Sequence, residues 1–245
     1  MTTNPPRFLV TAGNTRERID QVRDWGNIFT GNTGFDIARA LAALGEVDLL
    51  TSNRQHLAQI DAGLGLPHQV RGHAFTAHGE LRTALAALLK TQQYHAIFMT
   101  AAIADYKPAG VFSVLSREKT ETKGEEIWRV KDVQAGKVKS NHPAIAVLGT
   151  RTEKLIDLFR GEWGYRGLLV KFKLEVGPTR EELVRIGQAS RVASGADYLV
   201  ANTLDMVGGD KPGAILLSDK GEEWIARAAL AQRLARLAAN HPEGV

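Results

Sequence analysis

The chain has 245 residues, of which 44% are hydrophobic and 24% are charged, and its formal net charge is +4. This composition is typical of a soluble globular protein, and the absence of cysteine excludes a disulfide framework and thiolate chemistry. No apolar run approaches the ~18 residues of a membrane-spanning helix, and no basic segment interleaved with aromatic residues indicates nucleic-acid binding. We therefore expect a cytoplasmic protein that acts on small molecules and binds neither nucleic acid nor a membrane.

Strand and helix patterns alternate along most of the chain. The apolar strand runs are continuous, which is typical of parallel strands that are covered on both faces. The sequence therefore predicts an α/β fold with a Rossmann-like, mostly parallel sheet and helices on both faces. Strands are expected at 8–11, 47–51, 69–74, 96–100, 168–172 and 198–201, a strand pair at 214–217 and 223–225, and helices at 35–44, 81–89, 152–159, 180–193 and 226–239.

The alternation breaks down between about 106 and 142, where lysine and glutamate are frequent and large apolar residues are few. A structureless segment of this length inside a compact domain is usually functional or disordered. We expect one domain over 1–245 with a flexible insertion at about 106–142, which short strands at 127–130 and 144–148 interrupt.

Gly13 closes the first predicted strand, where a dinucleotide-binding protein has its first glycine. The full fingerprint needs two further glycines at fixed offsets and an acidic residue that closes the second strand. The chain instead continues as Asn14-Thr15-Arg16, and its second strand ends in Thr-Ser-Asn at 51–53. This disfavours a nicotinamide-dependent reductase, while a simple turn at Gly13 stays open.

The segment from Asn27 to Gly34 is a loop rich in glycine and hydroxyl groups that leads into a predicted helix. Free backbone N–H groups and the helix dipole favour an anion at such a position, and Thr30 and Thr33 add hydroxyl donors. The pattern therefore indicates phosphate binding, with helix capping by Thr33 as the alternative.

Further candidates stand near later strand ends. Asp105 follows the strand at 96–100, at the carboxyl edge where ligands of open α/β sheets bind; its carboxylate can accept from a ribose hydroxyl or cap a turn. At two later strand ends, Phe172 can stack on a base and Asn202 can bind a base edge. Lys137 lies in the irregular segment, where a lysine can close over phosphate or simply be a solvated surface residue.

Taken in order, these motifs resemble the phosphopantothenoylcysteine synthetase family, the phosphopantothenate–cysteine ligases of coenzyme A synthesis. The resemblance covers nearly the whole chain. Its motifs are 10–13 with 15–17, 19–20 and 22–23; Asn27 with Gly31 and Gly34; 101–106; 137–139; 172–175; and 201–202.

The resemblance implies a two-step ligase. ATP or CTP, with Mg²⁺, would activate the carboxylate of 4′-phosphopantothenate as an acyl nucleotidylate, and the amine of cysteine would then displace the nucleoside monophosphate. It also implies a homodimer with a small dimerisation subdomain, in which each substrate site is completed by the neighbouring chain. The implied roles are catalysis for Asn27 and Lys137; nucleotide binding for Gly13, Ala102, Ala104, Asp105, Phe172 and Asn202; and substrate binding for Thr30, Gly31 and Gly34, with no metal ligand assigned.

Several positions depart from the family pattern. Phe29 and Thr30 stand where the family has two serines, and Asn32 stands where it usually has lysine or arginine. Bacterial members carry lysines in the stretch that corresponds to 188–194, where this chain retains only Arg191. These changes remove cations from an anion site and leave ATP and CTP both open. Two alternative functions also stay open: a divergent paralogue that acts on another carboxylate, and a nucleotide-binding module without turnover.

Overall fold

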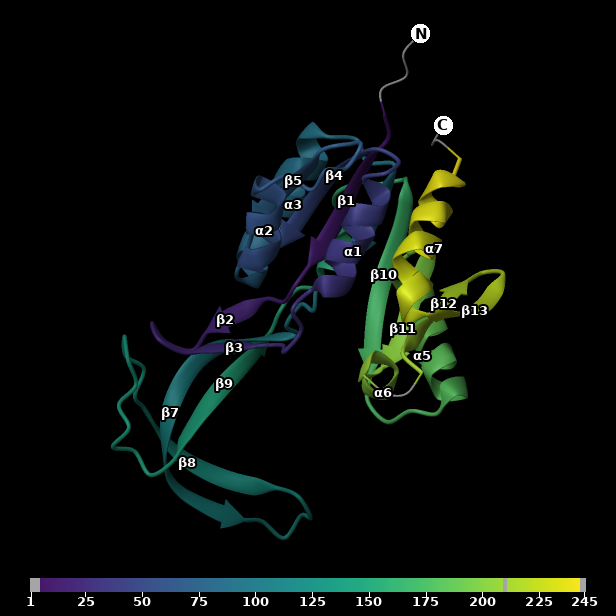
Figure 1. Cartoon of the computed structure of the whole chain (residues 1–245). Helices are drawn as coiled ribbons and strands as arrows, with labels where there is room; N and C mark the ends of the chain where they lie inside the picture. Colours follow the sequence, from purple (N-terminus) through teal and green to yellow (C-terminus); the bar gives the residue numbers. More distant parts are fainter. Residues whose placement is uncertain (1–4, 209–210, 243–245) are drawn as a thin grey trace.

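An eight-stranded sheet forms the centre of the molecule in the computed structural model, which describes residues 5–208 and 211–242 (Figure 1). The strand order is β13-β12-β11-β10-β6-β1-β4-β5. The strands from β11 to β5 are parallel, and β12 and β13 add antiparallel to the β11 edge. Their bounds are β1 (Arg7–Ala12), β4 (Glu46–Thr51), β5 (Val70–Ala74), β6 (Ala96–Met99), β10 (Leu168–Glu175), β11 (Tyr198–Thr203), β12 (Gly213–Ser218) and β13 (Gly221–Ala226).

Helices cover both faces of this sheet, so the predicted fold class is confirmed. One face carries α1 (Asn32–Leu41), α2 (Arg54–Asp61) and α7 (Arg227–Ala239). The other carries α3 (His78–Thr91), α4 (Leu155–Leu158) and α5 (Arg180–Ala193), while the short α6 (Leu204–Gly208) follows β11. In the described ranges, no helix combines the length and the apolar character that a bilayer crossing requires.

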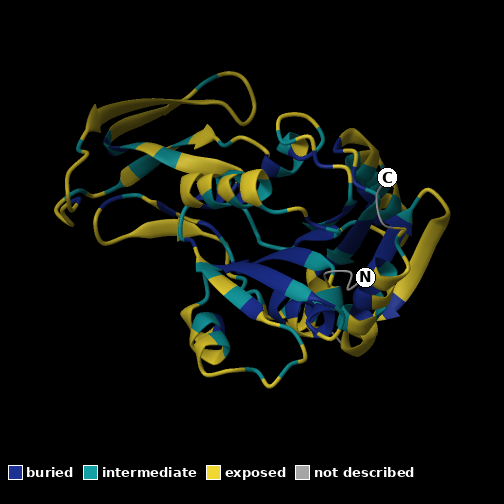
Figure 2. Ribbon diagram, turned by 90° about the horizontal axis from the view of Figure 1, so that it is seen from above, coloured by how far each residue is buried: buried dark blue, intermediate teal, exposed yellow. Residues whose placement is uncertain are grey.

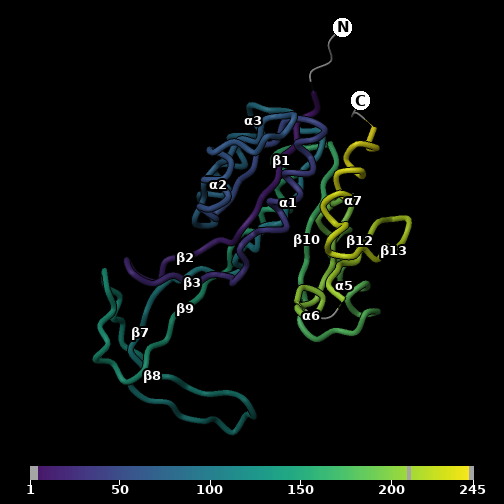
Figure 3. The backbone as a smooth tube through the Cα atoms, viewed as in Figure 1, coloured from purple at the N-terminus to yellow at the C-terminus, as the bar shows by residue number. Residues whose placement is uncertain are grey.

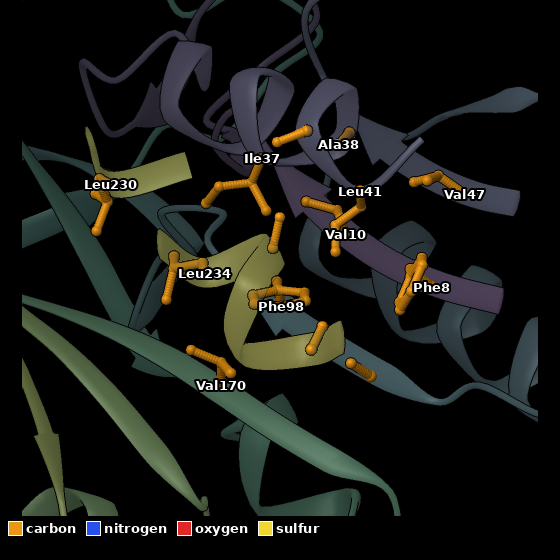
Figure 4. Packing of buried hydrophobic residues seen from close by; sticks show 14 of the residues in the cluster. Phe8, Val10, Ile37, Ala38, Leu41, Val47, Phe98, Val170, Leu230 and Leu234 are labelled. Carbon is orange, nitrogen blue, oxygen red and sulfur yellow. The ribbon is translucent and has the colours of Figure 1, made fainter. Parts of the chain in front are cut away.

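The core explains why the strand runs are continuously apolar. Successive strand residues point to opposite faces, so Phe8 and Val10 of β1 pack beneath α1 and α7, whereas Leu9 packs beneath α3. Figure 4 shows the first of these clusters, in which Ile37 of α1 and Leu234 of α7 lie over the strands. Both faces of each central strand are therefore buried, as the sequence predicts.

A separate three-stranded antiparallel sheet extends away from the central sheet (Figures 1 and 3). Its order is β8-β7-β9, with β7 (Tyr106–Lys119) in the middle, β8 (Glu126–Asp132) on one side and β9 (Ile145–Arg151) on the other. Much of it is exposed, and every residue of β8 is exposed (Figure 2). The sequence did not predict β7, because most of its residues are exposed or partly exposed and only Val111 and Ser113 are buried, which leaves little apolar pattern. The flexibility of 106–142 and the single-domain division stay predictions.

The remaining differences are local. The expected helix at 152–159 is reduced to the four residues of α4. The structure adds α2, in which only His56 is buried, and a small antiparallel pair, β2 (Arg16–Arg18) with β3 (Asp24–Gly26). These short elements are largely polar and are fixed by tertiary contacts, so they carry little periodic signal.

Candidate functional site

A cavity of about 320 Å³ lies at the carboxyl edge of the parallel sheet. It opens at the point where the strand order reverses. From β1, the chain adds β4 and β5 on one side of the sheet and then β6 and β10 on the other. Open α/β sheets bind ligands at this switch point. The lining residues are Gly13, Ile28, Phe29, Thr30, Gly31, Asn32, Thr33, Gly34, Thr100, Ala101, Ala102, Phe172, Lys173, Leu174, Val200, Asn202, Val207, Gly213, Ala214, Arg227 and Leu230.

Three glycines let the loop before α1 lie directly on the end of β1. Gly31 has φ +83°, and a Cβ atom there would overlap the backbone of Gly13. A Cβ atom on Gly34 would lie 2.8 Å from that of Ala12 and would also overlap the Thr100 hydroxyl. A side chain at Gly31 or Gly34 would push α1 away from the sheet edge, and one at Gly13 would collide with Ser52 after β4. The three glycines together therefore shape the floor of the cavity.

The N-terminus of α1 points its free backbone groups at this space. The N-cap residue is Gly31, which has no side chain to satisfy the first N–H groups, and the first three helix residues line the cavity. The capping role considered for Thr33 is therefore wrong, because Thr33 lies inside the helix. An uncapped N-terminus with its dipole favours a bound anion.

The loop before α1 is held from the β4 side. The Nδ2 atom of Asn53 donates to the carbonyl oxygen of Thr30 at 3.0 Å. The side-chain oxygen of Asn32 lies 3.1 Å from Nε2 of His56, whose ring stacks on Phe35 at a centroid distance of 4.4 Å. Burial lowers the pKa of His56, so the imidazole ring beside Asn32 favours its neutral form.

Asn27 lies beside the backbone of Ala102. Its Nδ2 atom donates to the carbonyl oxygen of Ala102 at 3.1 Å, and its own carbonyl oxygen accepts from the side chain of Asn14. The N–H group of Ala102 in turn donates to the carbonyl oxygen of Gly13 at 2.9 Å. The structure therefore brings together Asn27, Ala102 and Gly13, which come from three separate motifs.

Ala104 and Asp105 lie outside the cavity lining. The N–H group of Ala104 donates to the Thr15 hydroxyl at 2.8 Å, and its carbonyl oxygen accepts from the Thr152 hydroxyl at 2.7 Å. Asp105 is exposed, and its carbonyl oxygen accepts from the backbone of Thr152 at 2.9 Å. These bonds turn the chain away from the sheet edge toward β7.

The opposite wall comes from β10, β11, β12 and α7. Phe172 and Asn202 line it as expected, and Val200, Ala214 and Leu230 make it apolar. Two cations also line the cavity: Lys173, which belongs to the motif at 172–175, and Arg227, which the sequence did not single out. The Lys173 ammonium lies 2.7 Å from the Glu175 carboxylate. Arg227 is the first residue of α7, and no local pattern indicates that this helix returns to α1.

Lys171 points to the other face of β10. Its ammonium donates to the carbonyl oxygen of Ser190 at 3.2 Å and to the hydroxyls of Ser190 and Ser194 at 3.0 and 3.1 Å. Burial lowers the pKa of Lys171 to about 8. Lys171 therefore belongs to the packing of α5, not to the cavity.

Lys137 also lies outside the cavity lining. It is exposed, in the loop that follows β8, whereas the next residue, Val138, is 3% exposed. Within the described residues, no three histidine or acidic side chains gather as a metal site, and none of the cavity-lining residues is acidic.

The fold defines a Rossmann-like protein with a cavity at the switch point of its sheet, beside the N-terminus of α1. The model of the DNA/pantothenate metabolism flavoprotein C-terminal domain family matches residues 4–240, and the chain belongs to this family. This confirms the resemblance drawn from the motifs.

Individual relatives agree with this assignment. The chain is 29% identical over 212 residues to the coenzyme A biosynthesis bifunctional protein CoaBC of Thermococcus kodakarensis, covering 86% of this chain and 44% of that protein. It thus spans less than half the length of the curated relatives it matches. A DNA/pantothenate metabolism flavoprotein structure from Streptococcus pneumoniae superposes with a TM-score of 0.72 at 25% identity, covering 96% of this chain and 98% of that one. A Cab2 variant in complex with phosphopantothenate-cysteine shares the fold, with a TM-score of 0.66 at 14% identity over 96% of this chain and 85% of that one.

Proposed function

We propose that this chain is a nucleotide-dependent ligase that joins 4′-phosphopantothenate and L-cysteine in coenzyme A biosynthesis. The observation that carries the proposal is the switch-point cavity, where an uncapped helix N-terminus faces an apolar wall with an aromatic ring. Such a cavity suits a nucleotide, with its phosphates toward α1 and its base toward Phe172. Family membership and the names of the relatives supply the reaction.

In the first step, a carboxylate oxygen of 4′-phosphopantothenate would attack the α-phosphorus of ATP or CTP, and pyrophosphate would leave. In the second step, the cysteine nitrogen would attack the acyl carbon, release a proton and displace the nucleoside monophosphate. Both steps develop negative charge on oxygen, which positioned N–H donors and cations stabilise.

We assign the residues as follows. Asn27, held against Ala102, would present its amide to the acyl intermediate, and Lys137 would neutralise the phosphoryl oxygens. Thr30, Gly31 and Gly34 would bind the substrate at the start of α1. The nucleotide would contact Gly13, Ala102, Phe172 and Asn202 in the cavity. Ala104 and Asp105, which follow the lining, would complete its site, with the Asp105 carboxylate accepting from the ribose.

In this proposal, Mg²⁺ binds together with the nucleotide. The cavity lining contains no carboxylate, and Mg²⁺ in nucleotide enzymes is commonly held through substrate phosphates and water. A resident ion bound by this chain alone is not part of the proposal.

We also propose that the enzyme is a cytoplasmic homodimer that pairs through the three-stranded sheet. Exposed apolar side chains gather on its strands: Leu115, Ile127, Trp128, Val130, Ile145 and Leu148. Apolar exposure of this extent is typical of an interaction surface. Sedimentation equilibrium should give the mass of two chains, and a single-chain mass at micromolar concentration would contradict this part of the proposal.

The activity test combines the protein with 4′-phosphopantothenate, cysteine, Mg²⁺ and either ATP or CTP, and measures pyrophosphate and the coupled product. Lys137→Ala should lower turnover by about 100-fold to 1,000-fold, the usual effect of losing one oxyanion-stabilising group. Lys139→Ala is the matched control, because Lys139 is also exposed, on the other side of Val138, and has no proposed role. Both variants should keep the wild-type melting temperature.

The outcomes separate the alternatives. An absence of pyrophosphate with both nucleotides would contradict the ligase, and tight nucleotide binding without turnover would instead support a binding module. Pyrophosphate release with a different carboxylate, and none with 4′-phosphopantothenate, would identify a divergent paralogue.

A further inference from the structure

The carboxylate of Asp20 is the centre of a buried hydrogen-bond network outside the cavity. Its side chain is fully buried in the turn 19–23 between β2 and β3. One oxygen accepts from the backbone N–H groups of Val22 and Arg23, each at 2.9 Å. The other accepts from the Arg23 guanidinium, with Nε at 3.0 Å. The Arg23 guanidinium and these N–H donors hold the pKa of Asp20 far below its usual range, so the carboxyl group is ionised at neutral pH.

The same carboxylate also binds the loop 133–139. Its second oxygen accepts from the backbone N–H of Val138 at 3.1 Å, and the Arg23 guanidinium donates back to the carbonyl oxygen of Val138 at 2.7 Å. Both backbone groups of one buried loop residue are thus satisfied by one ion pair. A charged acceptor makes these bonds stronger than neutral ones.

Two further bonds fasten the same two segments. The N–H group of Gln21 donates to the carbonyl oxygen of Gly136 at 2.9 Å, and the side chain of Gln134 donates to the carbonyl oxygen of Ile19 at 3.1 Å. Lys137 lies between two residues that are bonded to the turn, although its own side chain is exposed. The loop is therefore attached on both sides of the lysine.

The turn leads directly to the other proposed catalytic residue. Residues 19–23 are followed by β3 and then by Asn27, whose amide is bonded to Ala102. We infer that Asp20 is a positioning residue: it fixes the loop 133–139 to the turn 19–23 and so sets the place of Lys137 relative to Asn27. The role of Lys137 in this inference rests on the proposed function, whereas the attachment of the loop rests on the hydrogen bonds alone.

Asp20→Asn tests the inference, because it keeps the size of the side chain but removes the charge and turns one of the two acceptor oxygens into an NH₂ donor. In either orientation of the amide, that NH₂ group would face N–H donors. Asp24→Asn is the matched control, since Asp24 is exposed on neighbouring β3. Amide hydrogen exchange at 136–139 should accelerate by about 10-fold in Asp20→Asn and not in Asp24→Asn. Turnover should fall by up to about 100-fold, the effect of a misplaced catalytic group, with nucleotide affinity unchanged.

A double-variant comparison separates positioning from general destabilisation. In a Lys137→Ala background, Asp20→Asn should lower turnover little further, because the positioned group is already absent. Val138→Ala keeps both backbone hydrogen bonds but removes the buried side chain that packs this part of the loop, so it loosens the attachment from the loop side and covers a failure of Asp20→Asn to fold. It should accelerate exchange at 136–139 and lower turnover in the same direction.

Each result decides a definite point. Unchanged exchange at 136–139 in Asp20→Asn and Val138→Ala would overturn the inference, as would a full additional loss of turnover in the Lys137→Ala background. If the wild-type protein releases no pyrophosphate, the ligase proposal fails, and hydrogen exchange still decides whether Asp20 fixes the loop.

Discussion

Replacing Lys171 by methionine should stabilise the protein at neutral pH. The ammonium is held in the interface between β10 and α5, and burial lowers its pKa from 10.5 to about 8. At 1.36 kcal/mol per pKa unit, this shift corresponds to about 3 kcal/mol of destabilisation of the charged form. Lys171 is partly exposed, so water screens part of that energy. We expect Lys171→Met to raise the free energy of unfolding by about 1–3 kcal/mol at pH 7.

Of the two serine hydroxyls that accept from Lys171, that of Ser190 is on a partly exposed residue, and that of Ser194 keeps other partners in this variant. The Ser194 hydroxyl already donates to the carbonyl oxygen of Ser190 at 3.0 Å and to that of Arg191 at 3.1 Å. Methionine has a long, flexible and apolar side chain that can fill the space of the lysine stem. The loss of the ammonium should therefore outweigh the loss of its hydrogen bonds.

The pH dependence gives the sharper test. Below pH 8 the amine is protonated in both the folded and the unfolded states, and the penalty is fully present. Between pH 8 and 10.5 the unfolded chain binds more protons than the folded one, so the free energy of unfolding of the wild type rises with pH through this group. The advantage of Lys171→Met should therefore shrink between these two values.

Urea denaturation at pH 7 and pH 9.5 measures both effects. Lys220→Met is the control, because Lys220 lies exposed in the turn between β12 and β13, and it should change the free energy of unfolding by less than about 0.5 kcal/mol at either pH. A Lys171→Met variant that is less stable than the wild type at pH 7, or whose advantage is equal at both pH values, would refute the reasoning.

Two further predictions concern the cavity. Gly31→Ala should destabilise the protein by about 1–3 kcal/mol more than Gly63→Ala, because both glycines have φ +83° but only Gly31 lies against another backbone; equal losses in urea denaturation would show that the close approach is unimportant. Phe172→Ala should weaken nucleotide binding by about 10-fold or more, since a base stacked on an aromatic ring contributes about 1–3 kcal/mol. Phe112→Ala, in the three-stranded sheet, should leave the affinity unchanged. Calorimetric titration measures both affinities, and an unchanged affinity in Phe172→Ala or an equal loss in Phe112→Ala would contradict the stacking role.

Much of the central fold follows from the sequence, because burial on both faces demands continuous apolar runs. Phe8, Leu9 and Val10 illustrate this, since adjacent residues of β1 enter cores on opposite sides of the sheet. The carboxyl ends of parallel strands meet at one edge, which is why Gly13, Phe172 and Asn202 line one cavity although they are far apart in the chain.

The path of the backbone could not be predicted where the chain leaves the sheet, and the roles of Ala104 and Asp105 stay predictions. Small residues after β6 indicated a ligand-contacting backbone as far as Asp105, but the lining stops at Ala102. The reason is a tertiary hydrogen bond from Ala104 to the buried hydroxyl of Thr15, which begins the turn toward β7. Residue spacing alone does not indicate which backbone groups a distant threonine will satisfy.

The position of Lys137 could not be predicted either, because it depends on a hairpin with no apolar periodicity. β8 pairs antiparallel with β7, and its last residue, Asp132, lies opposite Phe112 near the middle of β7, whereas Glu126 lies opposite Lys119 at the far end. The chain therefore returns from the tip before the loop 133–139 begins, and Val138 meets Asp20 across 118 positions of sequence. In an antiparallel pair, residues added in matched numbers at the tip lengthen both strands together. The tip of this hairpin can thus change in length without moving Lys137, whereas a change in the turn 19–23 would move it directly.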